Sequence, residues 1–190
     1  MSRPARLVAA VVTAVVAGVL APPRARADDD AARARFVADR DAKGLLARLE
    51  ASGAPGDRAW LPLARLAADP AGRAGPGEPS ALARVVDALR VLDLPRARAH
   101  APALVAEAGV AGAWAEALVA GRGGQDETAA RRLLDAGVPD VARDAFALAL
   151  LGAALPRDDR ELLAGLVRGA LVRSGAAGRL DPVARLAAAS

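Results

Sequence analysis

The sequence predicts an all-α fold of antiparallel helical hairpins, arranged either as an irregular helical bundle or as an α-solenoid. Three observations support this prediction. Apolar residues recur at helical spacing, and no segment alternates apolar and polar residues as a half-buried strand does. Ala, Leu and Arg dominate the composition, and all three favour helices. Short Gly- and Pro-rich breaks separate the helical segments, and such short connections are typical of antiparallel neighbours.

The first 27 residues have the organisation of a secretory signal peptide. Arg3 and Arg6 precede an uncharged apolar stretch, 7–21, and small residues stand at positions 25 and 27, before a cleavage site. We therefore expect cleavage after Ala27, and export of the mature chain to the periplasm or the extracellular space. An uncleaved N-terminal anchor is the alternative. Because a spanning helix needs about 20 apolar residues, we expect no stable membrane span after cleavage.

The charge balance argues against nucleic acid as a partner. The chain has a net charge of +4, but the segment 1–27 contains no acid and four arginines, Arg3, Arg6, Arg24 and Arg26. Removing them leaves residues 28–190 with as many basic residues as the 22 acidic ones. A protein that binds a polyanion keeps a basic excess. The chain also lacks Cys, which excludes disulfides and thiolate chemistry.

Two helices are clearest in the mature chain. One follows Ser80, the expected N-cap, and its apolar stripe consists of Leu82, Val85, Val86, Leu89 and Leu92. The other starts at Asp158, where Asp158 and Glu161 are similar to a capping box. Gly175 follows the end of this second helix as the expected C-cap.

Weaker patterns predict further helices. They cover residues 29–42, 45–51, 57–68, 102–108, 111–120, 126–136 and 139–151, with a last helix from Asp181. Trp60 and Trp114 lie on apolar helix faces, so we expect both in the core. Residues 28–190 are expected to form a single all-α domain, with a flexible loop near 69–79.

One segment is similar to a known helical repeat. Residues 138–145 carry Pro-Asp and Val-x-Arg at the opening of a predicted helix, and residues 147–152 close that helix at a glycine. A second predicted helix, Arg160 to Arg173, follows. Together, residues 138–172 resemble a HEAT-type repeat of the short bacterial kind. The resemblance implies that the second helix packs back on the first, that the protein is a protein-binding scaffold, and that the segment holds no catalytic residue.

The chain offers few groups for catalysis. His100 is its only imidazole, and it lies near Arg96 and Arg98, which is typical of a solvated helix end. No Gly-x-Ser-x-Gly motif is present. The loop 121–125 lacks the Lys and Ser/Thr of a phosphate-binding loop and is interpreted as a turn.

Metal ligands are equally scarce in the sequence. With one His and no Cys, only the acidic groups 28–30 and Asp158, Asp159 and Glu161 could bind an ion such as calcium. We interpret the first group as a solvated N-terminus and the second as a helix cap. The sequence therefore predicts no catalytic residue, no cofactor and no metal site.

These observations favour an exported, non-enzymatic helical-repeat protein that acts as a scaffold and binds another protein. Two alternatives stay open. A compact helical bundle could hold a lipid or another apolar ligand between its small side chains. A carboxylate-dependent envelope hydrolase could use Asp158, Asp159 and Glu161.

Overall fold

The computed structural model describes residues 23–75, 77–137, 141–173 and 175. Within these ranges the protein is all-α and has no strand, which confirms the predicted fold class. The helices form an irregular bundle. In chain order they are α2 (Pro23–Asp39), α3 (Ala42–Ser52), α4 (Pro55–Arg58), α5 (Leu61–Ala68), α6 (Ala81–Arg90), α7 (Leu94–His100), the 3₁₀ helix η1 (Ala101–Ala103), α8 (Leu104–Arg122), α9 (Asp126–Asp135), α10 (Val141–Ala154) and α11 (Arg157–Arg173).

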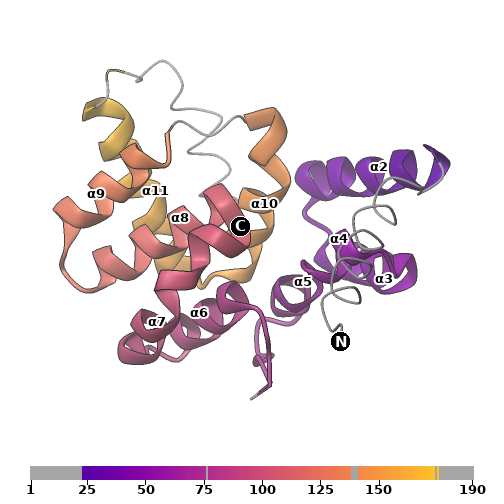
Figure 1. The fold of residues 1–190 in the computed structure, drawn as a ribbon, viewed down its shortest axis with the longest axis horizontal. Helices are drawn as coiled ribbons and strands as arrows, with labels where there is room; N and C mark the ends of the chain where they lie inside the picture. The colour runs from indigo at the N-terminus through magenta and orange to yellow at the C-terminus, as the bar shows by residue number, and fades with distance from the viewer. Residues whose placement is uncertain (1–22, 76, 138–140, 174, 176–190) are drawn as a thin grey trace, which may run out of the picture.

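The bundle has two parts that meet at α10. Figure 1 shows α2 to α5 on one side and α6 to α9 with α11 on the other, with α10 between them. Helix α10 packs against α2 and α5 on one flank and against α8 on the other. Of the described helices, α6 and α8 hold the most buried residues, and Trp114 of α8 is 2% exposed, as the sequence predicts.

Aromatic residues join the two parts. The Phe146 ring of α10 makes edge-to-face contacts with Phe36 of α2 and with Trp60, at centroid distances of 6.1 and 5.5 Å. The Arg33 guanidinium lies 5.2 Å from the Phe146 centroid and also pairs with the buried Asp57 at 2.6 Å. Trp60 is therefore partly buried at this junction rather than deep in the core.

Helix α6 begins as the sequence predicts. The Ser80 hydroxyl accepts a hydrogen bond from the Ala83 N–H at 3.2 Å, which confirms Ser80 as the N-cap. Glu107 of α8 adds a second cap from outside the helix. Its carboxylate accepts from the Ser80 hydroxyl at 2.6 Å and from the Ala81 N–H at 2.7 Å. Negative charge at this end also suits the helix dipole.

The end of α6 differs from the prediction. Leu82, Val85, Val86 and Leu89 are buried, but Leu92 is 79% exposed. The helix ends at Arg90, and Leu92 takes a left-handed backbone conformation with φ of 57°. The turn thus carries Leu92 off the helical stripe. It leads into α7, which the sequence patterns do not predict and whose first turn contains Pro95.

Helix α8 is broken at Gly109, where the sequence predicts the gap between two helices. Gly109 has φ of 53° and ψ of −124°, a conformation that side-chain-bearing residues rarely adopt. Three residues later, a Cβ on Gly112 would lie 2.0 Å from the Leu104 carbonyl oxygen. The two glycines let the chain turn sharply while both halves of α8 stay packed.

Helix boundaries elsewhere differ in detail from the prediction. The predicted helix over 57–68 is two helices, α4 and α5, on either side of Trp60. Gly53, with φ of 63°, ends α3, and Gly137, with φ of 77°, follows α9, as the two predicted breaks require. Residues 138–140 and the helix predicted from Asp181 lie outside the described residues.

The predicted capping box at the start of α11 is wrong. The helix begins at Arg157, so Asp158 lies inside the first turn rather than at the cap. Glu161 instead accepts a hydrogen bond from Arg157 Nε at 2.9 Å. Gly175 follows the helix with φ of 72°, as expected for a residue beyond a helix end.

Helix α11 packs on α8 and α9 rather than chiefly on α10. The resemblance of residues 138–172 to a HEAT-type repeat implies close packing of the second helix on the first, and this part of the expectation does not fit the observed contacts. Membership of that family stays a prediction.

Within the described ranges, one stretch is long and apolar enough to cross a membrane. It runs from Leu94 to Arg122, with a mean hydropathy of 1.4 in its most apolar window, and 56% of that window is buried inside the bundle. The stretch includes the 3₁₀ segment η1 and the break at Gly109. A core helix meets the same length and composition criteria, and α8 packs against α6, α9, α10 and α11.

The predicted cleavage site falls inside a helix. Helix α2 is described from Pro23 and continues through Ala27 and Asp28. The packing residues of α2 described above, Arg33 and Phe36, both lie beyond the site. Export and cleavage after Ala27 stay predictions.

Candidate functional site

Three carboxylates are buried in the described part of the chain, and each is paired with arginine. Asp57 is 2% exposed, Asp87 0% and Asp159 1%. Asp57 pairs with Arg33 at 2.6 Å and also accepts a hydrogen bond from the Ser52 hydroxyl. Buried ion pairs of this kind are found both at functional sites and as structural supports.

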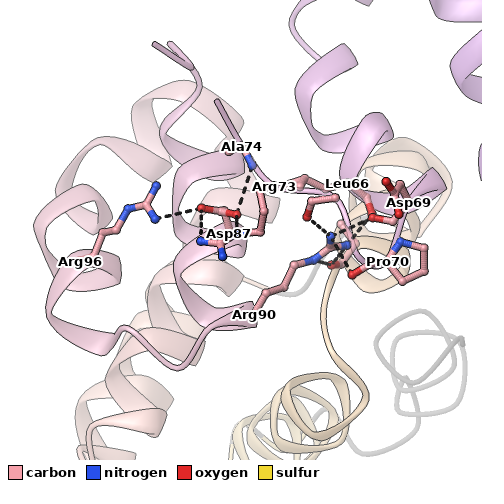
Figure 2. A network of polar contacts seen from close by, with 10 residues as sticks. Leu66, Asp69, Pro70, Arg73, Ala74, Asp87, Arg90 and Arg96 are labelled. Carbon is pink, nitrogen blue, oxygen red and sulfur yellow. Dashed lines mark hydrogen bonds and ion pairs between the residues drawn. The ribbon is translucent and has the colours of Figure 1, made fainter. Parts of the chain in front are cut away.

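Asp87 organises the loop before α6. Its carboxylate accepts from Arg73 Nε at 2.5 Å and from the Ala74 N–H at 3.1 Å, both in the loop, and it pairs with Arg96 of α7 at 3.0 Å (Figure 2). Burial alone would raise the pKa of Asp87. The hydrogen bonds from Arg73 and Ala74, with the charges of Arg73 and Arg96, outweigh burial and lower this pKa below its usual value.

Arg90, one turn further along α6, binds backbone carbonyls instead of a carboxylate. Its guanidinium donates to the carbonyl oxygens of Leu66, Asp69 and Pro70 (Figure 2), and also to those of Gly72 and Ala154. Burial lowers the pKa of Arg90, and nearby Asp87 and Asp69 oppose that effect. Asp87 and Arg90 together fix residues 69–74 onto α6. The flexibility predicted for the loop near 69–79 stays a prediction.

Asp159 is the buried carboxylate whose pKa is raised. Burial is the main cause, and the hydrogen bond and charge of Arg122 only partly offset it. Arg122 Nε donates to Asp159 Oδ1, whereas the buried Oδ2 has no hydrogen-bond partner. The pair joins the end of α8 to the first turn of α11, where each charge suits its helix dipole.

The residues of the hydrolase alternative do not converge. Asp159 is closed off from solvent, whereas Asp158 is exposed and Glu161 pairs with the exposed Arg157. A catalytic pair of carboxylates must face one substrate. Because only one of the three is buried and it is sealed by Arg122, the geometry gives this alternative no support.

The other residues considered from the sequence also stay apart. His100 is half-buried at the end of α7, and the loop 121–125 is the turn between α8 and α9. The acidic residues 28–30, considered above as possible ion ligands, lie on α2, where Asp30 is exposed. In the described ranges, no three His, Cys, Asp or Glu residues gather as ligands for one metal ion.

A groove between α8 and α9 is the best candidate for a binding site. It has a volume of about 680 Å³, and we call it the α8–α9 groove. We call its apolar lining residues the floor, and they include Val105, which is 49% exposed. Its lining residues are Val105, Gly109, Val110, Ala113, Glu116, Thr128, Arg131, Arg132, Asp135 and Ala136.

The break in α8 shapes this groove. Gly109 redirects the chain between Val105 and Val110, and all three residues line the groove. Arg132 of α9 pairs with Glu116 of α8, and this pair ties the two walls together. We call the charged lining residues Glu116, Arg131, Arg132 and Asp135 the rim, which contains both signs of charge.

Comparison with protein-family models, with curated proteins and with solved structures finds no match for this chain.

Sequence reasoning missed the groove and the buried polar residues of α6. Asp87 and Arg90 lie away from the apolar stripe of α6, which suggests a solvated face, but Asp87 and the neighbouring Ala83 are both fully buried. The signal for the groove is Gly109, because a glycine inside an apolar helical pattern marks a break.

Proposed function

We propose that this protein is an exported, non-enzymatic binding protein that holds a helix of another protein in the α8–α9 groove. The observation that carries the proposal is the groove itself, about 680 Å³ in volume, with an apolar floor that includes the half-exposed Val105 and a rim of mixed charge. An apolar floor between two helices is the surface on which an amphipathic helix docks.

The rim favours a protein over a lipid as the occupant. Arg131 and Arg132 stand on it with Glu116 and Asp135, so the two signs balance. The anionic head of a fatty acid or lipid would approach two carboxylates as well as two guanidinium groups. A protein helix can present both signs and match such a rim.

A photo-reactive amino acid at Val105 tests the proposal. The full chain is expressed in its host, the crosslinker is activated, and the crosslinked product is mapped by mass spectrometry. We expect crosslinks to one amphipathic segment of one protein. Val172, on α11 and 60% exposed, serves as the matched control position and should not give that product.

Two results would contradict the proposal. Crosslinks to lipid alone would favour the ligand-holding bundle instead. Equal products from Val105 and Val172 would show that exposure, rather than the groove, determines the crosslink.

A further inference from the structure

Two charges on the rim of the α8–α9 groove have no strong partner. Arg131 is 74% exposed, and its nearest acid, Glu127, lies 3.6 Å away and is 91% exposed. An ion pair this exposed contributes little and opens easily. Asp135 is also exposed, and no ion pair or hydrogen bond connects it to another residue in the described ranges.

The second pair of charges on the rim is already engaged, although Arg132 Nε has no hydrogen-bond partner. Arg132 and Glu116 are bound to each other, and their side chains are 39% and 17% exposed. Breaking this pair to bind a partner would leave a half-buried charge without compensation. The charges available to a partner are therefore Arg131 and Asp135.

We propose that the partner is an amphipathic helix with one acidic and one basic side chain, a single turn apart, beside its apolar stripe. The inference rests on the proposed function and specifies the chemistry of the same site. Arg131 and Asp135 are four residues apart on α9 and so lie one turn apart on one face. A partner helix that runs along α9 can place its acidic side chain against Arg131 and its basic side chain against Asp135. This match is possible whether the partner runs parallel or antiparallel to α9.

A displayed library of helical peptides tests this inference. Each peptide has a fixed Leu/Ala stripe, and two positions one turn apart are varied among Glu, Lys and Gln. The library is selected on the full chain and on its Val105→Glu variant as the groove control. We expect enrichment on the parent protein alone. Peptides with one Glu and one Lys should bind about twofold to fivefold more tightly than those with two like charges.

Single charge reversals sharpen the test. In Asp135→Arg both free rim charges are positive, so selection should shift to peptides with two Glu. In Arg131→Asp both are negative, and selection should shift to two Lys. Both positions are exposed, so neither substitution threatens the fold, and circular dichroism verifies this.

The outcomes separate the two claims. Two results overturn this inference and leave the proposed function standing. One is enrichment that depends on Val105 but not on the charges of the peptide, and the other is enrichment that does not shift in the charge-reversal variants. No enrichment on the parent protein beyond the Val105→Glu variant overturns both. Displacement of a selected peptide by dodecanoate at micromolar concentration would assign the groove to a lipid and also overturn the inference.

Discussion

Arg90 Nε and Nη2 both donate to the carbonyl oxygen of Ala154, at 3.0 and 2.8 Å, across 64 positions of sequence. Ala154 is the last residue of α10, and the same guanidinium donates to the Leu66 carbonyl in the last turns of α5. One cation therefore caps two helix C-termini, where the carbonyls have no helical partners and the dipole favours positive charge. The arrangement joins the two parts of the bundle.

Loss of Arg90 should therefore destabilise the whole fold. Arg90→Ala leaves several carbonyls without a donor, so we expect a loss of about 2–4 kcal/mol in the free energy of unfolding, measured by urea denaturation. Arg90→Lys should recover only part of this lost stability, because a single ammonium group cannot donate to both helix ends as the planar guanidinium does. Arg84→Ala, on the same helix, is the control and should cost under about 1 kcal/mol. Equal losses in both alanine variants would contradict the capping role.

Asp87 should make the protein sensitive to acid. Its pKa is lowered in the folded state, so its contribution to stability is complete above about pH 4, the usual unfolded value, and is lost as pH falls through the folded pKa. Asp87→Asn should be less stable than the parent at pH 7 and show a smaller further loss on acidification. Urea midpoints between pH 2.5 and 7 measure this. A parallel pH dependence in the two proteins would argue against it.

Asp159 should have the opposite effect on the pH dependence of stability. Its pKa is raised in the folded state, so its stabilising contribution is present below about pH 4 and is lost as pH rises through the folded pKa. Asp159→Asn should thus change the stability at pH 7 by no more than about 1 kcal/mol, or increase it. Arg122→Met leaves Asp159 without its counter-charge and should cost about 3–5 kcal/mol at pH 7 and much less at pH 4. A cost of Arg122→Met that does not change with pH would refute this account.

Gly109 should be required for the break that shapes the groove. Gly109→Ala forces a side-chain-bearing residue into φ of 53° and ψ of −124°, and we expect a loss of about 1–3 kcal/mol. Gly165→Ala is the matched control, because Gly165 lies on α11 with no atom within 4 Å of an added Cβ. The free energy of unfolding of this control should rise by up to about 1 kcal/mol, because Ala has a higher helix propensity than Gly. Thermal unfolding of both variants gives the comparison, and equal effects would contradict the requirement.

The predicted export can be tested on the mature N-terminus. N-terminal sequencing of the protein recovered from the envelope and secreted fractions should give Asp-Asp-Asp, from Asp28 onward. Recovery of the intact N-terminus in the membrane fraction would support an uncleaved anchor instead.

Local patterns predicted much of the fold because the decisive interactions are local. The hydroxyl of Ser80 caps the helix that follows it, and Gly53 and Gly137 end helices through their own backbone freedom. The break in α8 was also readable, since Gly109 interrupts an apolar pattern. Helix α7 was missed because Leu92 continues the stripe of α6 in sequence although the chain has already turned.

The candidate site could not be predicted in the same way. Its walls come from α8 and α9, and its rim depends on which charges find partners in three dimensions. Glu116 and Arg132 look as solvated in sequence as Arg131 and Asp135, yet only the first two are bound to each other across the groove. Likewise, no spacing rule pairs Asp159 with Arg122, 37 residues away.

Chemical-shift mapping tests the central claim most directly. A peptide selected on the full chain is added to the ¹⁵N-labelled full chain, and amide shifts are recorded. The account predicts that the largest changes fall on residues 105–113 and 128–136, the two walls of the α8–α9 groove, and vanish in the Val105→Glu variant. Changes centred instead on another hollow, such as the one lined by Arg35, Phe36 and Arg48, would contradict the assignment of the groove as the binding site.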